Sequence, residues 1–481
     1  MMELLSVQKA AIEARGDNKG FGYFMEQGLG KTLTSYADFQ ELLAERIVTR
    51  LVVICPNSFK AGWVADAEKH GLDYDFFIWS AGMEGYLRSW IKKEFKKPPC
   101  LIINWESIRA KSKKIIKNGR PKKEWYATPL MELVMEFAAG RGMIVFDESI
   151  QAKTHDSAQT MGATWVSGAF NHRRILSGKP ITQGPHDLWG QMKLIGHMNR
   201  NFYAFRTAFC KMGGWQGKQV MGAQNEDILA ELIEPYVFRA TKADWTDLPP
   251  KNYSIREYKM TAEMQSMYNA MEEEFVLWLN DTDNVAVDAA ITKYIKLAQI
   301  QCGWIYDEDG KIHWLVKDSK NPRLNLLQEV VETEVSGKVL IPYNHKPVYE
   351  QLLRTFGEDK SAWITGGMQP EDIEEQKRRF NEDPEVMYMF LQTRASKYGH
   401  TLLGLQHIPD LACKTMIPYE NTYSLDDRSQ IEDRPHRHGQ NYPMSYIDLV
   451  GTPLDKNCVA ALQRKENVFQ AVFAPLRASK R

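Results

Sequence analysis

The residues best suited to do chemistry in this chain form a glycine-rich loop near its beginning, where positions 27–32 read Gln-Gly-Leu-Gly-Lys-Thr. Gly28 and Gly30 have no Cβ atoms, so backbone N–H groups can turn inward around a β-phosphate at the start of a helix. Lys31 adds positive charge for the β- and γ-phosphates, and the hydroxyl of Thr32 suits Mg²⁺. The pattern predicts a site for ATP and Mg²⁺ formed by Gln27, Gly28, Leu29, Gly30, Lys31 and Thr32.

An apolar run that ends in two adjacent carboxylates supplies the second part of this chemistry. Residues 141–150 read Arg-Gly-Met-Ile-Val-Phe-Asp-Glu-Ser-Ile, which is typical of a buried parallel strand. A carboxylate at the C-terminal end of such a strand faces the ligand crevice of an open α/β sheet. Asp147 is therefore predicted to hold hydrated Mg²⁺, and Glu148 to orient and deprotonate an attacking water. The alternative is an acidic pair that caps the following helix.

A third group of residues lies far downstream, at positions 430–440, which read Gln-Ile-Glu-Asp-Arg-Pro-His-Arg-His-Gly-Gln. Negative charge builds up on a departing γ-phosphoryl group, and a guanidinium from an opposing domain can stabilise it. Arg437 is predicted to be that arginine. Arg434 would share its face if the stretch is helical, and would then contact phosphate or brace Arg437. Gln430 is predicted to hydrogen-bond a γ-phosphate oxygen or the water. The alternative is an exposed basic cap on a surface helix.

Short apolar runs predict the elements that must position these groups. In the first half they occur at 51–54, 101–104, 144–146 and 174–177, with helical or polar segments between them. Residues 19–25 predict the strand before the loop and residues 34–43 the helix after it. A second series begins near 321 and includes 338–341 and 386–391, while 261–279 and 287–301 have amphipathic helical patterns. We therefore predict an α/β fold with two parallel-sheet domains, 1–248 and 318–481, and a helical insertion at 249–317.

Composition limits the remaining possibilities. A chain of 481 residues with 43% hydrophobic residues is expected to form two or three domains. Lys+Arg and Asp+Glu are equal at 61, so only local basic clusters, at 92–97 and 111–123, could indicate a polyanionic partner. Either cluster could instead be a solvated loop.

The six scattered cysteines form no Cys-x-x-Cys pair, which favours a reduced protein without disulfides or a metal cluster. The sequence has no signal core and no apolar segment of about 20 residues, so we expect a soluble intracellular protein without a membrane partner.

The order of the motifs resembles that of the Swi/Snf-type ATPases of helicase superfamily two, which are double-stranded DNA translocases built from two RecA-like lobes. The resemblance rests on Gln8 and on segments 27–32, 54–63, 102–109, 141–150, 175–183, 238–250, 365–367, 379–384, 392–399 and 430–440. It implies that Gln8 contacts adenine and that ATP and Mg²⁺ lie between the lobes. It also implies nucleic-acid contacts by Trp63, Asn104, Thr393, Arg394 and Lys397, although Trp63 could equally be a core anchor.

Several positions depart from the usual pattern of that family. Ser149-Ile150 stand where alanine and histidine are typical, Lys179 stands where threonine is usual, and Gln27 replaces a methionine. The segment 395–400 is poor in glycine. These changes leave the hydrolytic groups intact. They are expected to affect the coupling between the lobes and the affinity for DNA. His436 and His438 flank Arg437 but, without a third ligand, do not predict a metal site.

The resemblance implies an ATP-dependent motor that moves on double-stranded or branched DNA, in replication, repair, recombination or branch migration. It would act as a monomer in the cytoplasm of a bacterial cell or phage-infected host. Two alternatives stay open. One is a conventional helicase that unwinds single-stranded DNA or RNA. The other is a nucleotide-regulated nucleic-acid-binding protein with little turnover.

Overall fold

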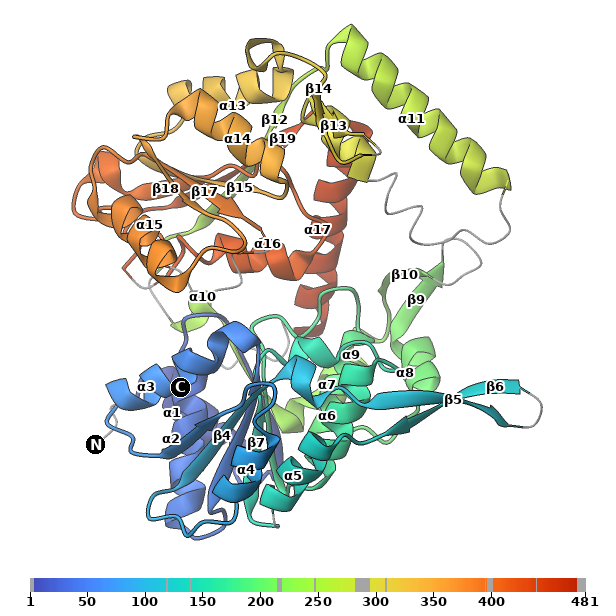
Figure 1. Cartoon of the computed structure of the whole chain (residues 1–481), viewed down its shortest axis with the longest axis vertical. Coiled ribbons are helices and arrows are strands. Elements are labelled where there is room, and N and C mark those ends of the chain that lie inside the picture. The colour runs from blue at the N-terminus through green and yellow to red at the C-terminus, as the bar shows by residue number, and fades with distance from the viewer. Residues whose placement is uncertain are drawn as a thin grey trace. The chain divides into compact units, whose positions relative to one another are not determined.

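The computed structural model describes residues 4–117, 120–138, 140–213, 219–245, 248–281, 295–307, 309–393, 395, 401–437 and 439–473. The chain forms two compact units (Figure 1). The first consists of residues 1–247 together with 464–481, and the second of residues 248–463. Helix α17 (Pro453–Phe473) contains the second of these boundaries, so its last turns belong to the first unit.

The first unit is built on a seven-stranded sheet in which every neighbouring pair is parallel. The order is β11-β1-β8-β7-β2-β4-β3, with β1 Gly20–Met25, β2 Arg50–Cys55, β3 Asp75–Ile78, β4 Pro99–Asn104, β7 Gly142–Phe146, β8 His172–Leu176 and β11 Val237–Ala240. The predicted runs at 51–54, 101–104 and 144–146 are confirmed as strands, and the run at 174–177 ends one residue early. Because the strands are parallel, the predicted chemical groups after β1 and β7 leave from one edge of the sheet.

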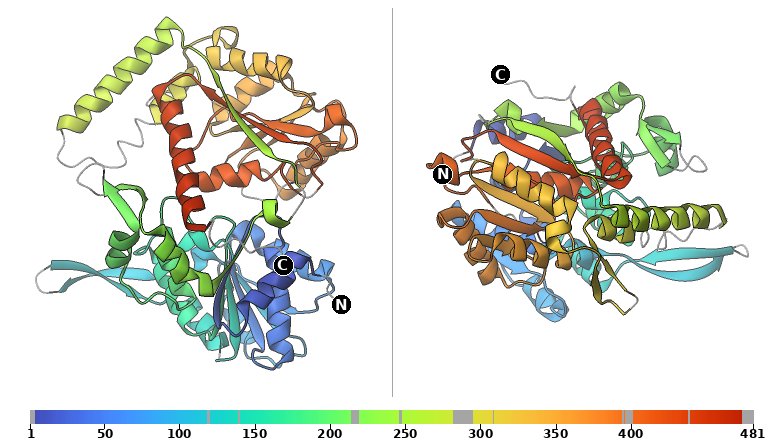
Figure 2. Two further views of the ribbon diagram at one scale, coloured as in Figure 1. Left: turned by 180° about the vertical axis from the view of Figure 1, so that it is seen from behind. Right: turned by 90° about the horizontal axis from the view of Figure 1, so that it is seen from above.

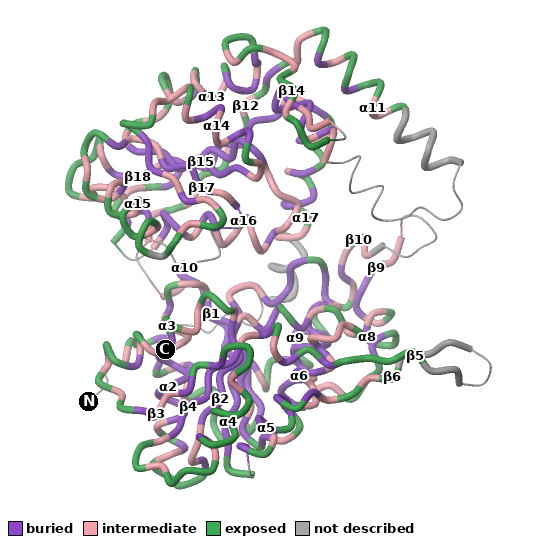
Figure 3. The backbone as a smooth tube through the Cα atoms, in the orientation of Figure 1, coloured by how far each residue is buried: buried purple, intermediate pink, exposed green. Residues whose placement is uncertain are grey.

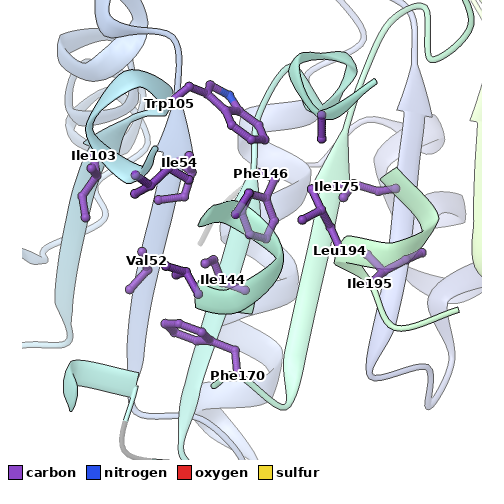
Figure 4. Close-up of a cluster of buried hydrophobic side chains, with 14 of the residues drawn as sticks. Val52, Ile54, Ile103, Trp105, Ile144, Phe146, Phe170, Ile175, Leu194 and Ile195 are labelled. Atoms are coloured by element: carbon purple, nitrogen blue, oxygen red, sulfur yellow. The ribbon is translucent and has the colours of Figure 1, made fainter. Parts of the chain in front are cut away.

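Side chains alternate between the two faces of this sheet, so the sheet has two hydrophobic cores. Figure 4 shows part of one core, with Val52, Ile54, Ile144 and Phe146 from β2 and β7. The residues between them in sequence, such as Val53 and Val145, belong to the other core. The first core is completed by α4 Glu84–Trp90, α5 Pro129–Ala138, α6 Ala158–Gly168, α7 Asp187–Leu194, α8 Phe202–Phe209 and α9 Glu226–Ile233. The second is completed by α1 Ser6–Arg15, α2 Lys31–Ala44 and α3 Lys60–Lys69.

Two antiparallel hairpins and a short helix complete the first unit. One hairpin pairs β5 (Lys111–Lys117) with β6 (Arg120–Tyr126), and the other pairs β9 (Cys210–Gly213) with β10 (Gln219–Ala223). Each hairpin is a separate two-stranded sheet. Helix α10 (Lys242–Trp245) follows β11. Figure 2 shows from two further sides that the β5–β6 hairpin projects from the seven-stranded sheet.

The second unit has a six-stranded sheet that is also entirely parallel. Its order is β12-β19-β18-β15-β17-β16, with β12 Lys251–Glu257, β15 Lys338–Tyr343, β16 Ser361–Ile364, β17 Tyr388–Gln392, β18 Cys413–Met416 and β19 Met444–Val450. Helices α13 (Pro322–Thr333) and α14 (Lys346–Phe356) contribute to one core, and α15 (Pro370–Glu382) and α16 (Leu425–Glu432) to the other. In Figure 3 the buried backbone of both units follows the central strands.

The range 249–317, predicted as a helical insertion, contains strands as well as helix. Its first element, β12, is an edge strand of the second sheet and pairs with β19. Helix α11 (Ala262–Asp281) agrees with the amphipathic pattern at 261–279, whereas most of the pattern at 287–301 lies outside the described residues. A small hairpin of β13 (Trp304–Tyr306) and β14 (Ile312–Trp314) follows. Among the described helices, none is both long and apolar enough to cross a membrane.

Candidate nucleotide-binding site

The glycine-rich loop has the backbone geometry that a phosphate-binding loop needs. It follows β1 directly and ends where α2 begins at Lys31. Gly28 and Gly30 have φ angles of +90° and +80°, a left-handed region that strains residues with a Cβ. At Gly30 a Cβ would also lie 2.1 Å from Nε2 of Gln8, so a side chain there would force the amide of Gln8 to move away. The residues present therefore fit a bound phosphate at the N-terminus of α2.

Gln8 and Lys31 are both held against this loop. The amide of Gln8 accepts a hydrogen bond from the backbone N–H of Leu5 at 2.8 Å, and its Nε2 donates to the carbonyl of Gly30 at 3.3 Å. Lys31 Nζ donates to the carbonyl of Met25, 2.9 Å away at the end of β1. A Cβ built on Gly178 would lie 3.7 Å from that same Nζ. Lys31 thus lies beside the segment 175–183, which is one of the segments that carry the resemblance to the Swi/Snf-type ATPases.

Asp147 lies at the end of β7 and is held by two tryptophans. Its Oδ2 accepts a hydrogen bond from the indole N–H of Trp63 at 3.0 Å, and its backbone carbonyl accepts one from Trp105 at 2.8 Å. The backbone N–H of Glu148 donates to Oδ1 at 3.0 Å. The carboxylate is therefore oriented before any ligand arrives, as a metal ligand should be.

The charge balance around Asp147 favours a cation. Burial raises the pKa of Asp147 above its ordinary value, and the charge of Asp66 adds to that effect. The Trp63 hydrogen bond, the Lys31 charge and the Glu148 N–H oppose it. A divalent ion would favour the ionised carboxylate. Among the described residues, no group of three His, Cys, Asp or Glu side chains could hold a metal, so Mg²⁺ at Thr32 and Asp147 would take further ligands from nucleotide and water.

Asp66 is a residue of this site that the sequence prediction missed. It lies on α3, three residues after Trp63, and the Thr32 hydroxyl lies near enough to its carboxyl group to influence the pKa of Asp66. Burial raises the pKa of Asp66, while the charges of Lys69 and His70 and the Thr32 side chain oppose that rise. Helix α3 thus places Asp66 near Thr32 and hydrogen-bonds Asp147 through Trp63. The spacing Trp-x-x-Asp on one helical face is the only sequence signal that indicates it.

Glu148 has an unusual backbone for a residue with a side chain. Its φ and ψ angles are 51° and 54°, in the left-handed region. Such a conformation costs of order 1–3 kcal/mol in a non-glycine residue, and the surrounding structure must impose it. Strain of this kind occurs at active sites, which supports a functional role for this carboxylate.

Three residues that depart from the family pattern, Ser149, Ile150 and Lys179, belong to the first unit. Ser149 is buried and donates to Oε1 of Gln191 at 2.8 Å, and Ile150 is buried as well. The replacement of the usual histidine therefore places an apolar side chain in the core. Lys179 forms an ion pair of 2.5 Å with Glu466, which lies in the part of α17 that belongs to this unit.

Lys242 is a second residue of the site that the prediction did not assign. Its side chain is buried, and a Cβ built on Gly28 would lie 3.7 Å from its Cε. Its backbone N–H donates to Glu26, 2.8 Å away and just before the loop. The segment 238–244 therefore forms part of the wall behind the phosphate loop. Because that contact spans more than 200 residues of sequence, no local pattern indicates it.

In the second unit, the three predicted residues occupy different environments. Helix α16 ends at Glu432, so Arg434 and Arg437 lie in the turn that follows rather than on one helical face. Arg437 is half-buried, and burial lowers its pKa despite the charge of Asp433. Its Nε donates to the carbonyl of Asp433 at 3.0 Å.

Arg434 is only 1% exposed, which favours the bracing role over phosphate contact. Gln430 donates to Asp426 at 3.0 Å.

The predicted nucleic-acid residues are not equally accessible. Trp63 is 1% exposed and packs edge-on against Tyr36, which favours the core-anchor alternative for its side chain. Thr393 is buried and donates to the carbonyl of Tyr343 at 3.1 Å. Asn104 is half-buried at the end of β4, where its amide donates to Glu106 at 2.8 Å. Arg394 and Lys397 lie outside the described residues.

Comparison with known proteins shows the family of this chain. A family model for the SNF2-related domain matches residues 23–303. The chain belongs to the SNF2-related family. The matched range contains the phosphate loop, Asp147 and Glu148, while Arg437 lies beyond it. Together with the two parallel sheets, the match confirms the predicted fold class of two RecA-like domains in tandem.

Several relatives of this SNF2-related chain have known sequences or structures. Putative protein p41 of Acyrthosiphon pisum secondary endosymbiont phage 1 is 28% identical over 46% of this chain and 50% of its own length. A SWI/SNF-related subfamily A-like protein 1 homolog from Caenorhabditis elegans is 29% identical over 48% of this chain and 30% of its own. The chain thus spans half or less of the length of these relatives.

The SWI2/SNF2 ATPase core of Sulfolobus solfataricus in complex with dsDNA is 20% identical, covering 98% of this chain and 93% of that one, with a TM-score of 0.40.

The contact between Asp66 and Thr32 leads to a prediction about metal affinity. Asp66→Asn is expected to raise the Mg²⁺ concentration that half-saturates ATP hydrolysis by about 10- to 100-fold, because residues that orient metal ligands have effects of this size. Glu68→Gln, on an exposed position of the same helix, is the matched control. The measurement is a Mg²⁺ titration at fixed ATP. An unchanged midpoint in Asp66→Asn would contradict the assignment.

Proposed function

We propose that this chain is an ATP-dependent motor that moves on double-stranded or branched DNA. The observation that carries the proposal is that the phosphate loop after β1 and the Asp147-Glu148 pair after β7 leave the same edge of one parallel sheet, in a chain of the SNF2-related family. We further propose that it acts in a bacterial or phage-infected cytoplasm, in replication, repair, recombination or branch migration. The relative from an endosymbiont phage supports only the phage setting.

Each side chain has a defined task in this proposal. Lys31 neutralises phosphate charge, Thr32 and Asp147 bind the metal, and Glu148 orients and deprotonates the attacking water. Mg²⁺, which Thr32 and Asp147 would hold, would supply positive charge to neutralise the phosphates. Arg437 stabilises the transition state from the second lobe. Because the two lobes would contact the nucleotide differently before and after hydrolysis, turnover would shift the lobes between two arrangements and move the chain along DNA as a monomer.

The first test concerns Arg437. Arg437→Ala is expected to lower DNA-stimulated ATP turnover by about 10³-fold or more, the effect of removing an arginine finger. ATP binding should change little, because the phosphate loop lies in the other lobe. The control is Arg378→Ala on α15, whose side chain is 58% exposed. Equal turnover in the Arg437 variant and the wild type would overturn the two-lobe site.

The substrate is tested by steady-state ATPase assays with duplex, forked, four-way and single-stranded DNA and with RNA, using Lys31→Ala as the inactive reference. The proposal predicts the strongest stimulation by duplex or branched DNA. Stronger stimulation by single-stranded DNA or RNA would favour the conventional unwinding helicase. Tight ATP binding with negligible phosphate release on every nucleic acid would favour the nucleotide-regulated binding protein.

A further inference from the structure

The β5–β6 hairpin is the most strongly charged element of a chain with no net charge. Residues 111–126 contain seven Lys or Arg residues and a single acid, Glu124, which gives the segment a net charge of +6. Lys111, Lys113, Lys114 and Glu124 are all exposed. One cation is compensated within the hairpin, because Lys113 pairs with Glu124 at 2.9 Å. Among the described residues, the exposed Lys111 and Lys114 add positive charge that an anionic partner can contact.

The strand register of the hairpin places like charges opposite each other. Lys114 is the cross-strand partner of Lys123, and Lys117 is the partner of Arg120. Like charges directly opposite one another destabilise a strand pair. The hairpin is also a two-stranded sheet without a third strand, an arrangement of marginal stability in water. A bound polyanion would remove this repulsion, so the sequence of the hairpin suits phosphates better than solvent.

The second basic cluster of the first unit differs in this respect. In the segment 92–97, Lys93 pairs with Asp75 at 2.6 Å and Lys97 pairs with Asp73 at 2.7 Å. Two of its four lysines are thus compensated by acids of the same unit. The hairpin is therefore the stronger candidate for a polyanion contact.

The dimensions of the hairpin fit a nucleic-acid duplex. Each strand has seven residues, and at about 3.3 Å per residue such a strand reaches about 20 Å. A two-stranded ribbon fits the major groove of B-DNA, which is about 12 Å wide, so the hairpin is long enough to cross the groove and approach both backbones. Figures 1 and 2 show it projecting from the first unit.

We propose that the β5–β6 hairpin is a DNA-binding element that contacts the phosphate backbone of duplex DNA without reading its sequence. The proposal rests on the motor function proposed above and adds a contact outside the family motifs. Because lysines contact phosphates independently of the base, the hairpin increases affinity for every duplex sequence equally.

The test compares two pairs of lysine substitutions in the full chain. Lys111→Gln/Lys114→Gln is expected to weaken duplex binding by roughly 10- to 100-fold at about 0.1 M salt, and to make the slope of log K against log [salt] shallower by about 2. The matched control, Lys92→Gln/Lys96→Gln, should change that slope by less than about 1. Glu124→Gln, which removes the single acid, should strengthen binding. Unchanged slopes in the hairpin pair, or weaker binding by Glu124→Gln, would overturn the proposal.

A shortened variant tests the hairpin without relying on single charges. Lys111 and Tyr126 are register partners, so an Asn-Gly turn can join them in place of residues 112–125. The ATPase activity of this variant without DNA should equal that of the wild type, whereas its affinity for duplex DNA should fall at least as much as in the Lys111→Gln/Lys114→Gln variant.

If the ATPase activity of the wild type is not stimulated by duplex DNA, the motor proposal fails. If it is stimulated but the shortened variant binds duplex normally, only the hairpin proposal fails. A loss of polyglutamate binding with intact duplex binding would indicate an acidic protein instead.

Discussion

Glu148→Gln is expected to lower ATP turnover by about 10²- to 10⁴-fold, the range that a positioned general base contributes. The amide keeps the shape of the side chain but cannot accept the proton of the attacking water. The backbone of residue 148, with φ of 51°, must be imposed by its surroundings, so the variant should retain it. ATP and Mg²⁺ should therefore still bind at Lys31, Thr32 and Asp147.

The matched control is Glu106→Gln. Glu106 is exposed and follows β4 at the same edge of the sheet, where it accepts a hydrogen bond from Asn104. Single-turnover hydrolysis and equilibrium ATP binding should be measured for both variants. If Glu148→Gln hydrolyses ATP at the wild-type rate, the base is another group, and the left-handed backbone at residue 148 has a different cause.

Asp38→Ala is expected to reduce the free energy of unfolding by about 3–5 kcal/mol, since it leaves a buried arginine without its counterion. Asp38 lies on α2, the helix that follows the phosphate loop, and it and Arg174 of β8 are both fully buried. Its carboxylate accepts hydrogen bonds from Arg174 Nε at 2.5 Å and from Tyr23 at 2.7 Å, and Arg15 lies 3.3 Å away. This network joins α2 to β1 and β8.

Glu41→Ala is the control for this prediction, because Glu41 pairs with the same Arg15 but is 46% exposed. Its loss should cost at most about 1 kcal/mol. Denaturant unfolding followed by tryptophan fluorescence measures both. If Asp38→Ala does not fold, Asp38→Asn keeps the shape of the side chain and should still lose more stability than Glu41→Ala. Equal losses for the two positions would contradict the role of the network.

The same network predicts how stability depends on pH. Burial alone would raise the pKa of Asp38, but the charge and hydrogen bonds of Arg174, with Arg15 and Tyr23, outweigh burial and lower it. A carboxyl group with a lowered pKa stabilises the fold above its unfolded pKa, and that contribution is lost as the pH falls through its folded value. The wild-type free energy of unfolding should therefore fall as the pH drops below the ordinary pKa of an aspartate. Asp38→Asn should show a smaller fall over the same acidic range when denaturant unfolding is measured at several pH values.

The sequence predicted the parts of the site that follow strands. Gly28–Thr32 and Asp147-Glu148 follow β1 and β7, as the apolar runs before them predicted, and the ends of parallel strands are where ligand groups are expected. The strands β2, β4, β7, β15 and β17 were predicted because both faces are buried, which gives continuous apolar runs. Strand β12 was missed because it is a sheet edge, with polar residues at most of its positions.

Asp66 and Lys242 could not be predicted because their roles depend on tertiary contacts. Asp66 is one acid on an ordinary helix, and only the fold shows that it reaches Thr32. Trp63 was assigned to two alternatives because an indole suits a core and a nucleic-acid surface equally. Its burial favours the core, where its indole N–H also reaches Asp147.

The discontinuity of the first unit has a consequence for protein synthesis. Residues 1–247 leave the ribosome well before residues 464–473 of α17 exist. All seven strands of its sheet lie in that early segment, so the sheet can form while the second unit is still being translated. The pairing of Lys179 with Glu466 has to wait until α17 has been synthesised, which is after the whole second unit.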